Sequence, residues 1–444
     1  MRKLLTALIA GLTTCSLLAG CTNPGSQNTN ETPTELSGEI TFWHSFTQGP
    51  RLETIQQAAD SFTAKHPDVS IKIETFSWSD FYTKWTTGLA SGNVPDLSTA
   101  LPSHVVEMIE SEAIIPLDDL IDSVGRDRFQ EAPLKEMTLD EATYAVPLYS
   151  HAQVMWYRKD LLAKYDLTVP TTWEEFAAAA NTITAGEKGE AYGVSVPMGT
   201  NDMMATRFLN FYTRSAGSSL LTSDHKPNLT SPEAIEGTTY WTDLYRSASP
   251  KDSLNYNVLD QATLFYQGKT AFDFNSGFHI SGVKENRPDL LEQIDAAPIP
   301  SVSGTPKAGY ETSNIPLVVW KNSKHPEIAK AFIEHLYQDE QYIPFLLSVP
   351  VGMLPALKDV AENKTYLADP TVQEFQEELK VISEAVGVGS AIGMESGPNP
   401  EAGLLTSQHV VEEMFQDIIV NSTAVPAAAE SANSKLAKLF ESLG

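Results

Sequence analysis

From residue 39 onward the sequence alternates between two kinds of hydrophobic spacing, and this alternation limits the folds open to the chain. Residues 39–43 and 69–76 alternate apolar and polar side chains, as strands do, whereas residues 52–65 and 81–90 repeat apolar side chains every three or four positions, as helices do. The same pattern returns at 144–148, 154–157, 172–184 and 192–196. Strands that alternate with helices are typical of α/β proteins with largely parallel sheets, in which ligands collect at strand ends and between domains.

Several helix starts are marked by capping residues. Thr172 is followed three residues later by Glu175, which matches a capping box, in which each side chain binds the backbone N–H of the other residue. Ser231 followed by Pro232 predicts another helix start. Trp173 and Trp241 fall within these helices, so we expect them to pack in the core.

The composition is that of a globular protein with an acidic surface. The chain has 444 residues, of which 42% are hydrophobic, and its length is enough for two or three domains. It carries 57 Asp and Glu against 30 Lys and Arg, a net charge of −27. A nucleic acid or an anionic membrane surface would need a basic face, so both are excluded as charge-driven partners. With only two cysteines, a disulfide framework is also excluded.

The first twenty residues have the features of a secretory signal peptide. A short basic start is followed by an apolar run, residues 4–18, that is too short to span a membrane. The run ends in Leu18-Ala19-Gly20-Cys21, which resembles the bacterial lipobox, so Cys21 is the expected site of lipidation. The alternative is an ordinary cysteine after a plain signal peptide.

Residues 21–38 are expected to form a flexible linker to this lipid anchor. They are rich in Pro, Asn and Thr and almost free of apolar side chains, so they cannot bury a core. No later segment approaches the length of a membrane span. Anchor, linker and acidic body together predict a protein held at the extracytoplasmic face of the cell membrane.

Five stretches of the body carry a family resemblance. They are Ile40–Ser45, Ala90–Asp96, Val169–Phe176, Phe265–Ala271 and Asn322–Ala329. In sequence and in order, these stretches resemble those of the extracellular solute-binding proteins of ABC importers, in the group that binds sugars.

The resemblance implies a periplasmic-binding-protein-like fold, in which two α/β lobes are joined by a hinge and enclose a ligand cleft. Lobe one is then expected at 39–148 plus 299–343, and lobe two at 149–298 plus 344–444. The chain would cross between the lobes near 148–150, 297–301 and 343–348.

The resemblance also implies a function. The protein is expected to capture a sugar or oligosaccharide between its lobes and to deliver it, as a monomer, to the permease subunits of an ABC transporter. Neither a catalytic residue nor a cofactor or metal is expected.

Five candidate ligand-binding residues follow strand ends in lobe one. A sugar needs aromatic surfaces for its C–H faces and polar partners for its hydroxyls. Trp43, His44 and Phe46 end the first strand, and Trp78 and Asp80 lie in the loop after the second. Three of them have a structural alternative: Trp43 as core, His44 as a cap, and Asp80 as the N-cap of the next helix.

Five further candidates come from the hinge, from lobe two and from loops. His151 lies where the hinge enters lobe two, and Phe278 stands where the family often has Trp in a Gly-x-Trp motif. Because Phe stacks without donating a hydrogen bond, the resemblance is weaker there. Tyr310, Glu311 and Glu395 lie in loops that would reach the cleft. For these loops the alternative is a plain surface position.

Other functional classes lack their motifs. The sequence has no His-Glu-x-x-His, no Gly-x-Ser-x-Gly and no histidines with metal-ligand spacing. A polyol or glycerol phosphate is an alternative ligand, but a phosphate needs Arg or Lys, and the candidate loops hold almost none. A surface-anchored glycoside hydrolase would need two carboxylates about 5–10 Å apart. An adhesin or structural lipoprotein is the remaining alternative.

Overall fold

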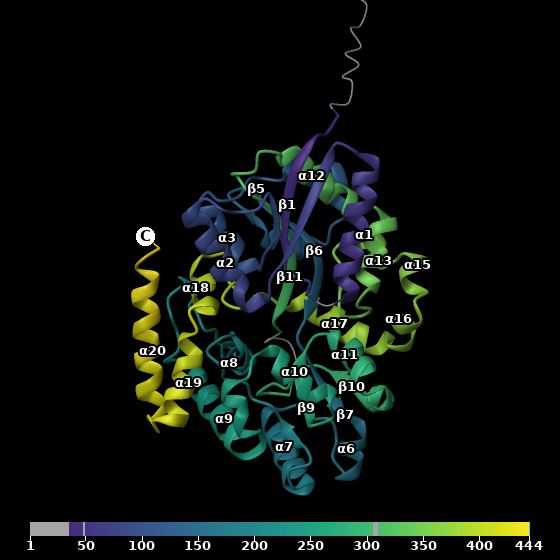
Figure 1. Ribbon diagram of the computed structural model, residues 1–444. Helices are drawn as coiled ribbons and strands as arrows, with labels where there is room; N and C mark the ends of the chain where they lie inside the picture. Colours follow the sequence, from purple (N-terminus) through teal and green to yellow (C-terminus); the bar gives the residue numbers. More distant parts are fainter. Residues whose placement is uncertain (1–34, 48, 305–309, 444) are drawn as a thin grey trace, which may run out of the picture. The chain divides into compact units, whose positions relative to one another are not determined.

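Two β-sheets carry the fold of the computed structural model, which describes residues 35–47, 49–304 and 310–443 (Figure 1). One sheet has the strand order β12-β6-β11-β3-β1-β2, and the other has the order β10-β7-β9-β8. We call the parts of the chain built on these sheets lobe one and lobe two. The expected signal peptide and Cys21 lie outside the described residues.

The strands are short, and the four strands of lobe two are consecutive in the chain. Lobe one contains β1 (Gly38–His44), β2 (Val69–Thr75), β3 (Leu97–Thr99), β6 (Val146–Ala152), β11 (Thr312–Val319) and β12 (Leu354–Pro355). Lobe two contains β7 (Val154–Arg158), β8 (Tyr192–Val194), β9 (Thr270–Asn275) and β10 (Ile294–Ala297). A separate ribbon joins β4 (Thr138–Leu139) to β5 (Ala142–Thr143). The strands of lobe two are inserted in the chain between β6 and β11 of lobe one.

The expectation of largely parallel sheets is wrong, because both sheets are mixed. β1 is parallel to β2 and β3, and β8 is parallel to β9, whereas β11 is antiparallel to β3 and β6. Only Gln153 separates β6 from β7, so the chain passes directly from one sheet to the other. β11 then returns from lobe two in the opposite direction. A parallel pair would have needed a crossover helix at these places.

Helices pack around the sheet of lobe one, and α1 and α2 among them were predicted from apolar spacing. Phe42 of β1 contacts Phe332 of α12 with ring centroids 6.0 Å apart, and Phe62 of α1 contacts the same ring at 5.5 Å. The helices of this lobe are α1 (Gly49–Lys65), α2 (Trp78–Ser91), α3 (Pro102–Glu110), α4 (Asp118–Val124), α5 (Glu131–Glu136), α12 (Pro326–Leu336) and α13 (Asp339–Leu347).

Lobe two is built around an aromatic core. Trp173 and Trp241 are both buried, with ring centroids 5.3 Å apart, so their expected core role is confirmed. The capping box is also present, since Thr172 accepts a hydrogen bond from the Glu175 N–H and Glu175 accepts one from the Thr172 N–H. The helices are α6 (Lys159–Lys164), α7 (Trp173–Glu187), α8 (Met204–Ser215), α9 (Pro232–Ala248), α10 (Val258–Tyr266) and α11 (Phe278–Asn286).

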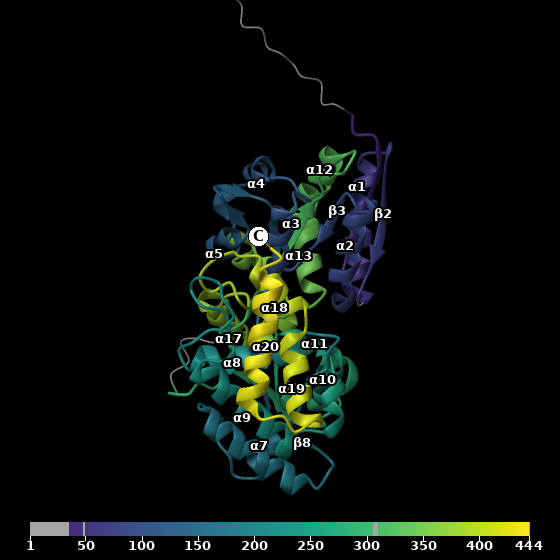
Figure 2. The ribbon, with the colours of Figure 1, turned by 90° about the vertical axis from the view of Figure 1, so that its left-hand side faces the viewer.

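The C-terminal part of the chain contacts both lobes. β12 pairs with β6, so lobe one continues past the expected crossing at 343–348, which covers the end of α13 and its C-cap Ser348. α17 packs on β6, β7 and β10, α18 contacts α3, and α19 contacts α8, as Figure 2 helps to follow. The helices are α14 (Lys358–Ala361), α15 (Lys364–Leu367), α16 (Pro370–Glu374), α17 (Gln376–Val388), α18 (Glu401–Ser407), α19 (Val410–Val420) and α20 (Val425–Phe440).

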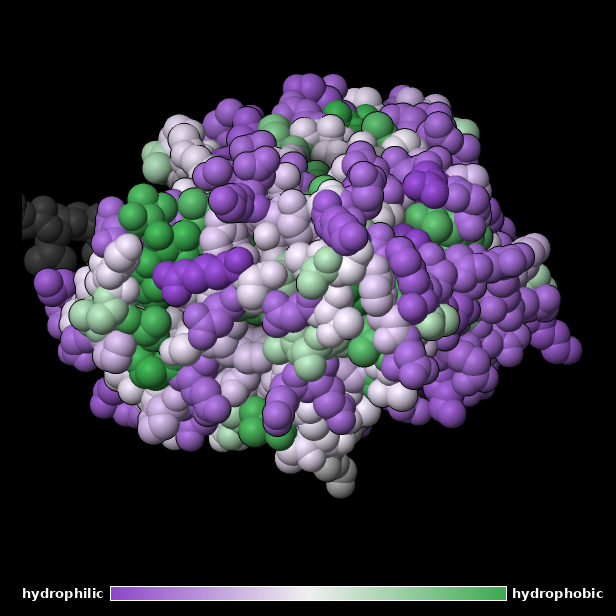
Figure 3. Space-filling view, turned by 90° about the horizontal axis from the view of Figure 1, so that it is seen from below, coloured by the Kyte–Doolittle hydropathy of each residue, from purple (hydrophilic) through white to green (hydrophobic). Residues whose placement is uncertain are grey.

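The surface agrees with the acidic composition. The face drawn in Figure 3 is mostly hydrophilic, with hydrophobic patches between. The large apolar side chains that stay exposed lie far apart in the sequence, namely Leu259, Val302, Leu367, Val388 and Val420. Within the described ranges, no helix combines the length and the apolar character that crossing a membrane requires.

Candidate functional site

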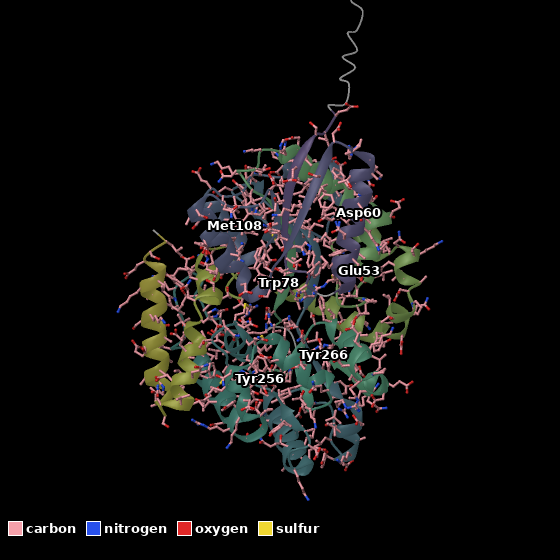
Figure 4. The ribbon with its side chains drawn as sticks, in the orientation of Figure 1. Glu53, Asp60, Trp78, Met108, Tyr256 and Tyr266 are labelled. Atoms are coloured by element: carbon pink, nitrogen blue, oxygen red, sulfur yellow. The ribbon has the colours of Figure 1, made fainter. Side chains whose placement is uncertain are left out.

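A cavity of about 260 Å³ lies between residues of both lobes. Its walls come from the starts of α1, α2 and α3 in lobe one and from α8, α10 and α11 in lobe two. The ends of β6, β9 and β11 and the segment around α18 complete the lining. Trp78 of lobe one and Tyr266 of lobe two lie on opposite sides of the space between the lobes (Figure 4).

Four of the ten candidate residues line this cavity: Trp78, His151, Phe278 and Glu311. Trp78 is the first residue of α2, and Phe278 is the first residue of α11. The ring of His151, from β6, lies 6.1 Å from that of Phe278. Helix starts and strand ends therefore bring these side chains together, as expected for an α/β protein.

Three candidates at the end of β1 lie in the core instead. Trp43 packs edge-on against Phe76 with centroids 5.3 Å apart, and Phe46 is fully buried. His44 accepts a hydrogen bond from the Phe46 N–H through Nδ1 at 3.1 Å and stacks on the Phe46 ring at 5.0 Å. Because β1 lies inside the sheet and is covered by helices, its last side chains fill the core of lobe one rather than the cavity.

Asp80, Tyr310 and Glu395 also lie outside the cavity lining. Asp80 is exposed in the first turn of α2, where it accepts a hydrogen bond from the Ser77 hydroxyl at 2.6 Å, and Ser77 is the N-cap. Tyr310 is buried, with 5% of its surface exposed. Glu395 forms an ion pair with Arg214 at 2.7 Å. Each side chain therefore has a local structural role.

The structure adds two arginines that the sequence reasoning did not single out. Arg51 of α1 is buried, and its guanidinium lies 4.8 Å from the centre of the Phe278 ring. Arg207 of α8 forms a two-pronged ion pair with Glu311, with Nε–Oε2 at 2.5 Å and Nη2–Oε1 at 2.8 Å. The candidate loops hold almost no cations, but both of these arginines are on helices.

The histidines of the cavity are neutral at ordinary pH. Burial lowers the pKa of His104 to about 3, and burial together with the nearby Arg207 and Arg51 lowers the pKa of His151 to about 3. Among the described residues, Nδ1 of each ring and Oε1 of Gln153 are buried without a hydrogen-bond partner. An unpartnered buried polar atom costs stability, so these atoms are suited to a polar ligand.

Glu412 of α19 fixes the start of α8, the helix that carries Arg207. Its Oε1 accepts hydrogen bonds from the Thr206 N–H at 2.8 Å and from the Thr206 hydroxyl at 2.9 Å. Burial raises the pKa of Glu412 to about 7, with a smaller contribution from Asp202. The carboxyl therefore holds this wall of the cavity without a counter-ion.

The carboxylates of the cavity are already engaged. Glu311 binds Arg207, and Asp202 accepts hydrogen bonds from the backbone N–H groups of Met203 and Val258. In the part of the chain that the structure describes, no three His, Cys, Asp or Glu side chains come together to hold a metal ion. The cavity therefore offers a ligand hydrogen-bonding groups, such as those of His151 and Gln153, and aromatic rings, such as those of Trp78 and Phe278.

Comparison with known proteins gives three findings. A family model described as bacterial extracellular solute-binding protein matches residues 47–343. A protein of Escherichia coli, whose name describes an ABC transporter periplasmic-binding protein, is 22% identical and covers 98% of both chains. The arabinooligosaccharide-binding protein of Halalkalibacterium halodurans is 24% identical over 77% of this chain and 76% of its own length.

The fold is shared with a solved structure. An ABC transporter solute-binding protein from Thermotoga lettingae, bound with alpha-D-tagatose, has a TM-score of 0.79 at 22% identity. The match covers 92% of this chain and 100% of that one. The expected two-lobed α/β fold is therefore confirmed.

Proposed function

Because the chain belongs to the family of bacterial extracellular solute-binding proteins, we propose that it is the substrate-binding component of an ABC transporter. It captures a sugar or a short oligosaccharide between its two lobes and delivers it to a membrane permease. The observation that carries this proposal is the cavity itself, which both lobes line with aromatic rings and hydrogen-bonding groups. Closing two lobes around a ligand is an established movement of binding proteins.

The chemistry of the cavity suits a neutral polyhydroxylated ligand. Trp78, Tyr266 and Phe278 offer apolar ring faces, while His151 and Gln153 offer neutral hydrogen-bonding groups. Carbohydrate ligands in the names of the arabinooligosaccharide-binding and tagatose-bound proteins support the same class.

We propose Trp78, His151, Phe278 and Glu311 as ligand-binding residues, together with Tyr266. The other six candidates lie outside the cavity lining, and they are Trp43, His44, Phe46, Asp80, Tyr310 and Glu395. Since Glu311 and Asp202 are engaged by other groups of the chain, we propose no catalysis, cofactor or metal.

A ligand panel tests the function. Without residues 1–20 and with Cys21→Ser, the protein is expected to be stabilised by about 2.7 kcal/mol when a bound sugar is present at about 100 times its Kd. The measurement is thermal unfolding with mono- and oligosaccharides, polyols and glycerol phosphates, followed by recovery of the sugar. The variant Trp78→Ala should lose the stabilisation.

Other outcomes of this panel are equally informative. Stabilisation by glycerol phosphates alone would change the ligand class, because Arg51 would then bind a phosphate. A sugar recovered in cleaved form would indicate a glycoside hydrolase. No stabilisation by any compound would contradict the proposal.

We further propose that the mature protein is a monomer anchored by a lipid at Cys21 to the extracytoplasmic face of the membrane. The support is the sequence Leu18-Ala19-Gly20-Cys21 at the end of an apolar leader. Cys21→Ala is expected to move the protein from the membrane fraction to the soluble fraction of the producing cell, as immunoblotting would detect. Membrane association that survives this substitution would contradict the anchor.

A further inference from the structure

One face of α10 forms an apolar wall of the cavity. Gln261 and Phe265 of this helix are buried in lobe two, where Gln261 donates a hydrogen bond to Asp273 and Phe265 stacks on His279 with centroids 4.7 Å apart. This anchoring turns the neighbouring row of the helix, Val258, Ala262 and Tyr266, toward the cavity. Leu259 lies beside Val258 and is 60% exposed.

The position of Tyr266 at the end of this row depends on a glycine. A Cβ atom at Gly282 of α11 would lie 2.1 Å from the Tyr266 ring, so only glycine lets the ring pack there. Together Val258, Leu259, Ala262 and Tyr266 present carbon atoms to the ligand, apart from the Tyr266 hydroxyl. We call this surface the α10 wall.

The facing part of lobe one also has apolar side chains. Trp78 starts α2, and Leu101 and Pro102 lie at the start of α3, and all three line the cavity. Trp78 and Tyr266 lie across the space from each other (Figure 4). These three side chains give lobe one an apolar surface next to the polar groups of Tyr82, Thr83, Ser103 and His104, which also line the cavity.

Hydrogen-bonding groups gather where the chain passes between the lobes. His151, Gln153 and Asn275 lie at the ends of β6 and β9, close to the Arg207–Glu311 pair at the start of β11. Nδ1 of His151 and Oε1 of Gln153 have no hydrogen-bond partner within the described chain. Asp202, next to the α10 wall, already uses its two carboxylate oxygens on backbone N–H groups.

Building on the proposed function, we propose that the cavity selects a pyranose ring whose hydroxyl groups are all equatorial. Such a ring has two C–H faces and carries its hydroxyls around its edge. Its faces then contact the α10 wall and Trp78, while its edge reaches the polar groups at the strand ends.

An axial hydroxyl would break this match. It points along the ring normal into a wall of carbon atoms, where it loses its hydrogen bond to water and gains none. The expected consequence is about 5- to 150-fold weaker binding for each axial hydroxyl.

Isothermal titration of the same soluble protein with epimers tests the inference. Methyl β-glucoside has only equatorial substituents, methyl β-galactoside has an axial hydroxyl at C4, and methyl β-mannoside has one at C2. Cellobiose and lactose form a second pair that differs only in one such hydroxyl. The glucose-type ligand of each pair is expected to bind at least fivefold more tightly.

Variants locate the selectivity in the α10 wall. Val258→Thr and Ala262→Ser each place a hydroxyl on the wall with little change in volume, so they are expected to reduce the preference to within about twofold. Val420→Thr makes the same exchange at a valine that is 63% exposed on α19 and should leave the preference unchanged.

The failures are distinguishable. Equal or tighter binding of the galactose-type ligand would overturn this inference and leave the proposed function standing. A preference that Val258→Thr and Ala262→Ser do not reduce would overturn the role of the α10 wall. If no sugar of the wider panel binds, the proposed function fails and the inference fails with it.

Discussion

Replacing Glu311 with alanine is expected to lower the free energy of unfolding by about 3–5 kcal/mol. The reason is that Arg207, whose side chain is 12% exposed, would stay buried without the carboxylate that now binds two of its nitrogens. Sugar binding is expected to be lost as well, because both residues line the cavity. Urea denaturation and ligand titration measure the two effects.

A double variant separates charge from packing. Arg207→Met with Glu311→Leu removes both charges, and replacing a buried pair by apolar side chains is often neutral for stability. We therefore expect the double variant to be close to the natural protein in stability while it still fails to bind sugar. A loss below about 1 kcal/mol in Glu311→Ala would show that water already solvates the pair.

The second large effect is a loss of stability in acid. Burial lowers the pKa values of His44, His104 and His151 to about 3 each, below the usual 6.5. Between pH 6.5 and pH 3 these histidines are protonated in the unfolded chain but neutral in the folded chain. The free energy of unfolding is therefore highest above pH 6.5 and decreases as the pH falls toward 3. Between pH 6.5 and pH 5 the three histidines together remove about 5 kcal/mol.

The variant His104→Phe tests whether buried histidines cause the loss of stability in acid. Phenylalanine keeps the aromatic contacts with Tyr82 and Trp85, whose rings lie 5.1 and 6.1 Å from the His104 ring, and it has no titrating nitrogen. Relative to the natural protein, its unfolding free energy should rise by about 2 kcal/mol between pH 6.5 and pH 5. Urea denaturation of both proteins at both pH values measures this change. If the two proteins lose the same free energy of unfolding between pH 6.5 and pH 5, His104 does not contribute to the acid sensitivity.

Glu412 provides a control with the opposite sign. Its folded pKa of about 7 lies above the usual 4.5, so its contribution is full below pH 4.5 and is lost as the pH rises through 7. Glu412→Gln keeps an oxygen for Thr206 and should be about 3 kcal/mol more stable than the natural protein at pH 8, with no difference at pH 4.5. Glu413→Gln, on the exposed side of the same helix where Glu413 pairs with Lys435, should change little.

Local signals in the sequence predicted the helices and strands but not their directions. Apolar spacing found α1, α2 and α7, and Thr172 with Glu175 located the start of α7. The direction of a strand depends on which lobe the next segment of the chain joins. The spacing of apolar residues within a segment does not indicate this. The two-residue strand β12 is too short for any period, so the end of lobe one was placed too early.

The candidate site was predictable where an aromatic residue started a helix or a hinge residue ended a strand. Trp78, His151 and Phe278 meet this condition and line the cavity. Trp43 lies in a strand that is covered by helices and Phe46 follows it, so the same reasoning placed core residues in the site. Arg51 and Arg207 are ordinary helix residues in the sequence, and only contacts with distant residues, Phe278 and Glu311, reveal them.

The strand order of lobe one has a consequence for how a newly made chain folds. β11 stands between β6 and β3, so a gap remains at the centre of the sheet until residues 312–319 have been synthesised. The four strands of lobe two lie within residues 154–297 and are complete earlier. Contacts between distant parts of the chain form slowly, because they must close long loops, and the pairing of β11 with β3 is such a contact. The sheet of the second lobe can therefore form before the sheet of the first, and the N-terminal strands stay available to chaperones until residues 312–319 have been made.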